Sequence, residues 1–348
     1  MNYLNWNIKA GRRSGKRHIA DRGRRGLGGK YHAMRHSDTG ADRVVTLGRN
    51  GSSLHAGVEL GGTKCVCTLA HGSGAIVEQK IVPTRQPEET LPAILAILQA
   101  WYREHRFAAL GVASFGPLEF DPASSRYGQI LATTKAGWAG TDVRGRLSAP
   151  FDVPIGFDTD VNGAALAEMA WGCAQGISDF AYVTVGTGVG VGLIVHGLPT
   201  RGIGHSELGH IRVPRLANDD QPSVCRFHDD CVEGLASGSA LALRLGERRA
   251  GDVARDDPIW EPVVHTLAAL CHAIVCATGP HRIAIGGGVL VGQPHLLARI
   301  EAGLTASLNG YMALPAGAAY VVAPALGDKA GPLGAIALAA QAPPRARQ

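Results

Sequence analysis

The residues from His205 to Gly238 hold the densest group of side chains that could do chemistry. His210 is followed, after a polar loop, by Cys225, His228 and Cys231 at three-residue spacings. Two thiolates and two imidazoles are a ligand set that tetrahedral Zn²⁺ accepts, and four protein ligands leave no position open for water. The pattern therefore predicts a structural zinc site. An ordinary loop with unrelated Cys and His residues is the alternative.

Two carboxylates lie close to these ligands along the chain. Glu207 precedes His210 by three residues, and Glu233 follows Cys231 by two. A zinc ion bound here would hold both carboxylate-bearing segments in place. We therefore expect the metal to shape a ligand site without taking part in the reaction.

Two further carboxylates, Asp158 and Asp160, stand between a predicted strand over residues 153–157 and a predicted helix over residues 163–171. A carboxylate at the carboxyl end of such a strand projects into the crevice where α/β sheets bind ligands. Either aspartate could instead cap the helix. We expect one of them to be a cap or structural partner and Asp160 to be the chemical group.

Two glycine-rich turns have a composition that lets backbone N–H groups approach an anion closely. They consist of Gly61, Gly62, Thr63 and Lys64, and of Gly186, Thr187 and Gly188. Each turn joins two predicted strands, 56–60 to 65–70 and a pair within 181–195, which indicates a duplicated unit with one phosphate-contacting turn in each half. A plain hairpin turn is the alternative for each.

The rest of the chain alternates strands and helices, which is typical of an α/β fold. Further strands are expected at 77–82, 110–113, 281–290 and 320–324, and helices at 88–105, 142–147, 241–251, 260–278 and up to 341. Gly286 and Gly287 predict close backbone approach to a base or ribose, unless they form a bare loop. The turn Ser114–Leu118 ends a strand, and Thr133–Trp138 forms a polar loop with one aromatic residue.

Composition limits the classes of protein that fit. With 45% hydrophobic and 18% charged residues, the 348-residue chain is long enough for two globular domains. Residues 1–50 carry twelve Lys and Arg against three Asp, a charge of +9, which leaves −4 of the total +5 for the remainder. The globular part therefore gives no signal for nucleic acid, and we expect a disordered basic leader over residues 1–53.

The cysteines and the apolar runs bear on the compartment. The five cysteines outside the predicted metal site read as small apolar residues of a reducing compartment, so we expect a cytoplasmic protein. We find no run that would span a bilayer; the closest, 181–198, is interrupted by five glycines.

Several motifs in a fixed order resemble the ROK family of sugar kinases and repressors, and within it the bacterial fructokinases that contain zinc. They are Glu59-Leu60-Gly61-Gly62-Thr63-Lys64, Ser114-Phe115-Gly116-Pro117, Phe157-Asp158-Thr159-Asp160-Val161-Asn162, Glu207-x-x-His210 and Cys225…His228…Cys231-x-Glu233-Gly234-Leu235-Ala236-Ser237-Gly238. The resemblance runs from about residue 54 to the C-terminus.

The resemblance implies a fold of two actin-like (ribonuclease H-like) ATPase domains that flank a cleft, with a zinc-pinned loop. The first domain would comprise residues 54–163 and 326–348, and the second, residues 164–325, would carry the zinc site and a dimer surface. A homodimer is the expectation of the family.

The resemblance also implies roles. Asp160 would be the general base, and Gly116, Thr159, Glu207, His210 and Glu233 would contact the sugar, with His210 also binding zinc. Gly61, Gly62, Thr63, Lys64, Gly186, Thr187 and Gly188 would face the ATP phosphates, and Gly286 and Gly287 the adenosine. Mg²⁺ would accompany ATP, and the acceptor would be fructose.

Alternatives remain open at this point. Glucose, mannose or an N-acetylhexosamine could replace fructose, because an epimeric hydroxyl is a small energetic difference. A sugar-responsive repressor is the second function, although residues 1–53 lack the periodicity of a helix-turn-helix. The chain departs from the fructokinases at Ser206, where Pro is usual, and at Lys329, where Asn is common. The first change could loosen the sugar loop.

Overall fold

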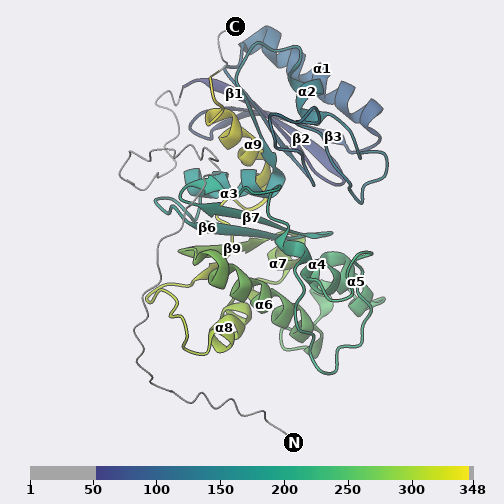
Figure 1. The fold of residues 1–348 in the computed structure, drawn as a ribbon, viewed down its shortest axis with the longest axis vertical. Helices are drawn as coiled ribbons and strands as arrows, with labels where there is room; N and C mark the ends of the chain where they lie inside the picture. Colours follow the sequence, from purple (N-terminus) through teal and green to yellow (C-terminus); the bar gives the residue numbers. More distant parts are fainter. Residues whose placement is uncertain (1–51, 345–348) are drawn as a thin grey trace, which may run out of the picture. The chain divides into compact units, whose positions relative to one another are not determined.

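The computed structural model describes residues 52–344. The predicted basic leader and the last four residues lie outside this range. The described chain forms two five-stranded mixed sheets with helices packed against them (Figure 1).

The first sheet has the order β3-β2-β1-β4-β5. Its strands are β1 (Leu54–Leu60), β2 (Lys64–His71), β3 (Ile76–Pro83), β4 (Leu110–Ser114) and β5 (Ile155–Thr159). Strands β1, β2 and β3 pair antiparallel, whereas β4 and β5 continue from β1 in parallel. Helix α1 (Pro87–His105) buries Leu91, Ile94, Leu98 and Trp101, the apolar stripe that the sequence predicts. Helix α2 (Val143–Ser148) follows.

The second sheet has the order β10-β9-β6-β7-β8. Its strands are β6 (Phe180–Val185), β7 (Val189–Val195), β8 (Leu198–Pro199), β9 (Arg282–Gly286) and β10 (Val321–Val322). Read from the β8 edge, the order is β8-β7-β6-β9-β10. If the strands of each sheet are numbered by their order along the chain, both sheets have the order 3-2-1-4-5, with the same strand directions. The duplication expected from the two glycine turns is therefore present in the topology.

Helices α6 (Glu261–Thr278) and α8 (Leu296–Leu308) cover one face of the second sheet, and α3 (Asp160–Trp171) lies on the other (Figure 1). Helix α9 (Ala330–Ala340) returns to β1 and β4 and also packs on α3. Gly163 and Gly334 allow this helix contact, since a Cβ on Gly334 would lie 2.6 Å from the backbone N of Ala164.

Several predicted boundaries were wrong. Helix α3 begins at Asp160 instead of Gly163, and α5 (Gly238–Leu245) ends where Gly246 adopts a φ of +59°, six residues before the predicted end. The strand predicted to reach Leu290 stops at Gly286, and residues 288–292 form the short helix α7. The sequence reading also missed α8 and the five-residue α4 (Val232–Ala236).

Among the described residues, one stretch passes a test of length and apolar composition for a membrane span; it contains the helix predicted at 260–278 and not the run 181–198 that was expected to come closest. It runs from Pro258 to Thr278 with a mean hydropathy of 1.5, and 56% of it is buried inside the protein. A core helix meets the same criteria, and α6 packs against α4 and α8, so this is weak evidence for a span.

Candidate active site

Asp160 occupies the first turn of α3, directly after β5. The helix is capped by Thr159, whose Oγ1 accepts a hydrogen bond from the N–H of Asn162 at 3.1 Å. The cap is therefore neither Asp158 nor Asp160. Asp160 Oδ1 accepts from the N–H of Val161 at 2.9 Å. Burial, and to a smaller extent the charge of Asp158, raise the pKa of Asp160 to about 6.

Asp158 is a structural partner for the same helix start. Its Oδ1 accepts hydrogen bonds from the Thr159 N–H at 2.6 Å and from Asn162 Nδ2 at 2.7 Å. Its other oxygen pairs with the guanidinium of Arg201, which also stacks 4.2 Å from the ring of Phe120. This network, in which Asp158 is buried and Arg201 reaches solvent, fixes the start of α3 and so the backbone that carries Asp160. Arg201 lies 43 residues from Asp158, and no local sequence pattern predicts this pairing.

In the first glycine turn, the carbonyl groups of three successive residues all accept hydrogen bonds. Thr84 donates its hydroxyl to Gly61 O at 2.8 Å and its N–H to Thr63 O at 3.0 Å, and Lys135 donates to Gly62 O. Within residues 52–344, the N–H groups of Gly62 and Thr63 donate no hydrogen bond. A turn with engaged carbonyls and free N–H groups presents positive dipoles to an anion.

The second turn repeats this arrangement. The carbonyl groups of Gly186, Thr187 and Gly188 accept from Gly238 N–H at 2.7 Å, from Ser239 Oγ at 3.0 Å and from Gly186 N–H at 2.9 Å. In the described chain, the N–H groups of Thr187 and Gly188 are again free of hydrogen bonds. A Cβ on Gly62 or Gly186 would meet nothing within 4 Å, so packing does not require glycine there, and both positions stay open to a ligand.

Glu59 is a carboxylate beside the first turn, and no role was predicted for it. It lies near the end of β1, against Gly331 at the start of α9. Burial, and then the charge of Asp160, raise the pKa of Glu59 to about 7, while Lys64 opposes the shift. A charged residue in an otherwise buried strand was the signal visible in the sequence.

Glu207 lies in a loop whose position depends on His205. The buried imidazole accepts the N–H of Leu118 at its Nε2, at 3.2 Å, and packs against Gly116. Burial lowers the pKa of His205, so the ring is neutral with its proton on Nδ1, which faces Ser206 O at 3.2 Å. Glu207 Oε1 lies 3.5 Å from the same Nε2. His205 therefore joins the Glu207 loop to the turn that contains Gly116.

Carboxylates connect the Glu207 loop with the second turn. Burial first, and then the charges of Glu233 and Asp160, raise the pKa of Glu207 to about 7. Glu233 Oε2 accepts the N–H of Val189 at 3.1 Å, at the end of the Gly186–Gly188 turn, and its other oxygen lies 4.0 Å from His210 Nε2. The predicted base, two predicted sugar contacts and the second turn thus lie in one region.

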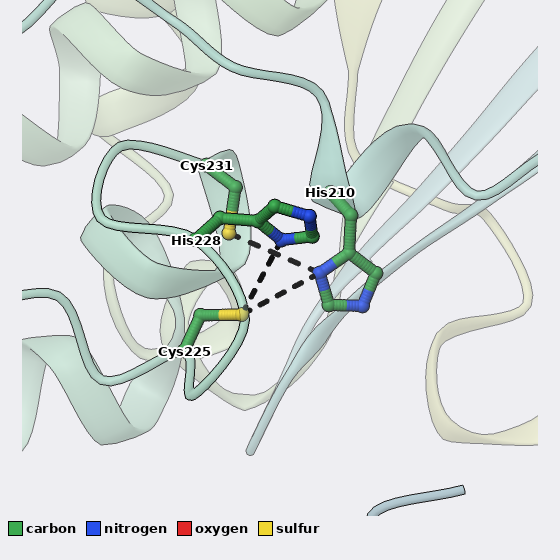
Figure 2. A group of neighbouring side chains, drawn as sticks. All are labelled: His210, Cys225, His228 and Cys231. Atoms are coloured by element: carbon green, nitrogen blue, oxygen red, sulfur yellow. Dashed lines mark hydrogen bonds between the residues drawn. The ribbon is translucent and has the colours of Figure 1, made fainter. Parts of the chain in front are cut away.

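The four predicted zinc ligands form a cluster. Residues 211–213 pair with 230–232, which brings His210 beside Cys231. Cys225 Sγ lies 3.8 Å from His210 Nδ1 and 3.6 Å from His228 Nδ1, and Cys231 Sγ lies 3.9 Å from His210 Nδ1. Figure 2 shows the four side chains converging on one point.

These separations fit a tetrahedral ion. With bonds of about 2.3 Å to sulfur and about 2.0 Å to nitrogen, the S···N edge of a ZnS₂N₂ tetrahedron is roughly 3.5 Å. All four ligand atoms lie within 4.8 Å of one another. The residues present therefore fit a closed Zn²⁺ site.

Three predicted positions have packing reasons that need no ligand. A Cβ on Gly287, whose φ is +89°, would meet the backbone of Val185, and one on Gly286 would lie 2.7 Å from Pro324. Thr159 is buried, and its hydroxyl caps α3. Adenosine contact by the two glycines, and sugar contact by Thr159, stay predictions.

The ROK family profile matches residues 55–342. A fructokinase of Pediococcus pentosaceus is 38% identical over 287 residues, which cover 82% of this chain and 97% of that relative. Among solved structures, a ROK hexokinase from Thermus thermophilus is 27% identical with a TM-score of 0.67, over 82% of this chain and 97% of its own. A ROK family transcriptional regulator, a homologue of E. coli MLC, superposes with a TM-score of 0.68 over 84% of this chain and 78% of its own, at 17% identity, so that likeness shows the fold alone.

Proposed function

Because the chain belongs to the ROK family, we propose that it is an ATP-dependent sugar kinase, and specifically a fructokinase that makes D-fructose 6-phosphate and ADP. The single observation that supports phosphoryl transfer best is the pair of glycine turns with engaged carbonyls and free N–H groups, in a protein that also places a partly buried Asp160 at a helix start. The 38% identity to a fructokinase over nearly the whole relative supports fructose as acceptor.

In the proposed reaction, Asp160 accepts the proton of the attacking sugar hydroxyl as that oxygen bonds to the γ-phosphorus and the bond to the β-phosphate oxygen breaks. Positioning and charge neutralisation dominate the catalysis of phosphoryl transfer. The free N–H groups of Gly62, Thr63, Thr187 and Gly188 would bind phosphate oxygens, with Lys64 nearby. A raised pKa of about 6 keeps Asp160 ionised at neutral pH while making it a better base than an exposed aspartate.

Mg²⁺ bound with ATP supplies neutralisation of the phosphate charge, held mainly by phosphate oxygens and waters. Glu59 and Asp160 are the carboxylates of the described chain that would receive its waters at the first turn. Gly286 and Gly287, at the end of β9, would lie against the adenosine.

Glu207, Glu233 and His210 would hold the sugar hydroxyls, and Gly116 and Thr159 would also contact the sugar. Ionised carboxylates accept two hydrogen bonds each from adjacent hydroxyls. Glucose, mannose or an N-acetylhexosamine are the alternative acceptors. Ser206, in place of Pro, donates to Val191 O at 3.2 Å and so ties this loop to β7.

We further propose that His210, Cys225, His228 and Cys231 hold a structural zinc ion. Its role would be to fix the two segments that carry Glu207 and Glu233. The division into an actin-like domain of residues 54–163 and 326–348 and a second one of residues 164–325, which flank a cleft, belongs to the same proposal. We also propose that the protein forms a homodimer through the second domain and that it is located in the cytoplasm.

A coupled ADP-release assay with fructose, glucose, mannose and N-acetylglucosamine tests the function, run on the wild type and on Asp160→Asn. We expect turnover of fructose that the substitution reduces by about 1000-fold or more, with sugar binding retained. Turnover of another hexose in place of fructose would change the acceptor and keep the mechanism. Absence of any Asp160-dependent turnover would contradict the kinase and favour the repressor.

A further inference from the structure

A loop closed at its base lies beside the first glycine turn. Ile130 accepts the N–H of Gly140 at 2.7 Å and donates its own N–H to Thr141 O at 2.9 Å, so residues 131–139 form a closed excursion. This excursion contains the polar Thr133–Trp138 segment, which has no predicted role and no part in the proposed reaction. We refer to it as the 131–139 loop.

Trp138 anchors this loop to the same segment that shapes the glycine turn. Its fully buried indole donates from Nε1 to Arg85 O at 2.9 Å and meets Phe115 edge-on, with ring centroids 5.3 Å apart. Thr84, the residue before Arg85, donates the two hydrogen bonds that Gly61 O and Thr63 O accept. The loop and the turn are therefore held by adjacent residues.

Lys135 extends from the loop to the turn. Its ammonium donates to Gly62 O, beside the free N–H groups of Gly62 and Thr63. Among the ion pairs of the described chain, none includes Lys135, so a partly buried positive charge has a neutral carbonyl as its hydrogen-bond partner. A cation without a carboxylate, next to unoccupied N–H donors, is an arrangement that suits a phosphate oxygen.

Lys64, the other lysine of the turn, is balanced differently. Its charge faces Glu59 and opposes the upward shift of that carboxyl's pKa. Within residues 52–344 Lys64 likewise belongs to no ion pair, but of the two lysines only Lys135 has its ammonium hydrogen-bonded to a carbonyl of the turn, beside the free N–H groups. The 131–139 loop also contacts the Cys225–Cys231 loop that carries three of the proposed zinc ligands, since Arg226 Nη2 donates to Thr133 O at 3.4 Å.

We propose that Lys135 is a further catalytic residue, whose ammonium exchanges Gly62 O for a non-bridging oxygen of the phosphoryl group in transfer. The inference rests on the proposed kinase function. Lys135 stays protonated throughout: the sugar oxygen bonds to phosphorus, the bond to the β-phosphate oxygen breaks, and the hydroxyl proton goes to Asp160. The ammonium neutralises negative charge on the equatorial oxygens as it spreads.

The test compares Lys135→Met, Lys135→Arg and Lys135→Ala with the wild type, using fructose and saturating Mg·ATP. Lys135→Met is expected to lower kcat by about 100- to 1000-fold, with the KM for fructose changed by less than about threefold. Lys135→Arg is expected to recover most of that loss. Ethylamine should restore part of the activity of Lys135→Ala but not of Lys135→Met, where the longer side chain fills the space.

Lys80→Met is the matched control, because Lys80 is a half-exposed lysine on β3 paired with Glu78 and lies outside the proposed site. A kcat of Lys135→Met within about threefold of the wild type would overturn the role. So would a loss that neither Arg nor ethylamine reverses and that goes with a lower melting temperature, since a purely structural contact predicts that outcome. If wild type and Lys80→Met phosphorylate no sugar, the kinase proposal fails, and the role of Lys135 fails with it.

Discussion

At the scale of single residues, the site depends on how each carboxylate is surrounded. Asp158 and Asp160 are two residues apart, yet their environments differ. Asp158 accepts two hydrogen bonds from nitrogen and pairs with Arg201, whereas Asp160 receives one hydrogen bond from its neighbour and is desolvated. Paired carboxylates whose environments differ in this way commonly separate into a structural group and a base.

Asp160 contributes to the acid limb of the proposed reaction, together with Glu59 and Glu207, whose pKa values are raised to about 7. A base must be deprotonated, so kcat/KM is expected to fall as the pH drops through about 6. In Arg201→Gln the charge of Asp158 is no longer compensated, which favours protonated Asp160. The acid limb should then move to higher pH, by roughly half a unit to one unit.

The measurement is kcat/KM for fructose between pH 5 and 8.5 on the wild type, Arg201→Gln and Arg201→Lys. The lysine variant keeps the charge and should return most of the shift. Arg299→Gln, which breaks an ion pair with Glu261 on distant helices, should leave the limb in place. An unshifted limb in Arg201→Gln would show that Asp158 and Arg201 do not tune the base. Glu59, Glu207 and Lys64 also face this region and are unchanged in every variant.

At the scale of elements, the sequence predicted what depends on local patterns. Short apolar runs on either side of a glycine turn predict β1 with β2 and the β6–β7 hairpin, and helical spacing predicts α1. Helix α8 was missed although Leu296, Ile300, Leu304 and Leu308 recur every four residues and are all buried. The positions between these residues are rich in Ala, Gly, Ser and Thr, which are poor evidence for a helix, and the segment was therefore not predicted to be helical.

The contacts that complete the site could not be predicted, because they join distant residues. Lys135 and Gly62 are 73 residues apart, and Arg226 and Thr133 are 93 apart. Neither lysine nor arginine carries a local signal that identifies such a partner. The Cys and His spacing was predictive because three of the four ligands fall within one seven-residue loop, Cys225 to Cys231.

Loss of the proposed zinc ion from the Cys225–Cys231 loop should separate sugar binding from chemistry. Cys225→Ala is expected to release about one zinc ion per chain and to raise the KM for fructose at least about tenfold, because Glu207 and Glu233 lose their shared support. The start of α3 is held by the hydrogen bonds of Asp158 and Thr159, which do not involve the cluster, so Asp160 should keep its position. Metal analysis together with steady-state kinetics checks both results.

Cys276→Ala is the control, since this exposed cysteine on α6 lies outside the cluster. It should retain the metal and the wild-type KM. Full zinc content in Cys225→Ala, or no zinc in the wild type after purification with zinc supplied, would contradict the proposed structural site. An unchanged KM in a variant that has lost its zinc would contradict the supporting role alone.

At the scale of the whole molecule, one helix connects the chemistry with the path of the chain. Helix α3 starts with Asp160 and, two turns later, carries Glu168, which is fully buried. The carboxylate of Glu168 accepts the N–H groups of Cys173 at 2.8 Å, Ala325 at 3.1 Å and Leu326 at 2.9 Å. Ala325 and Leu326 lie where the chain leaves β10 and returns to the first sheet as α9. Glu168 therefore holds the crossing between the two repeated sheets.

Glu168→Gln tests this role, because glutamine has nearly the same shape but only one acceptor oxygen. Its amide NH₂ would face N–H donors, so charge-assisted hydrogen bonds are lost without replacement. Removal of the buried charge offsets part of that loss. The free energy of unfolding is expected to fall by about 2–4 kcal/mol. Urea unfolding measures the change, and Glu104→Gln on the exposed end of α1 provides the control.

Because the crossing positions α9 against α3, the kcat of Glu168→Gln should fall as well, even at pH values where Asp160 is fully ionised. A midpoint equal to that of Glu104→Gln would mean that the backbone donors find other partners and that Glu168 does not hold the crossing.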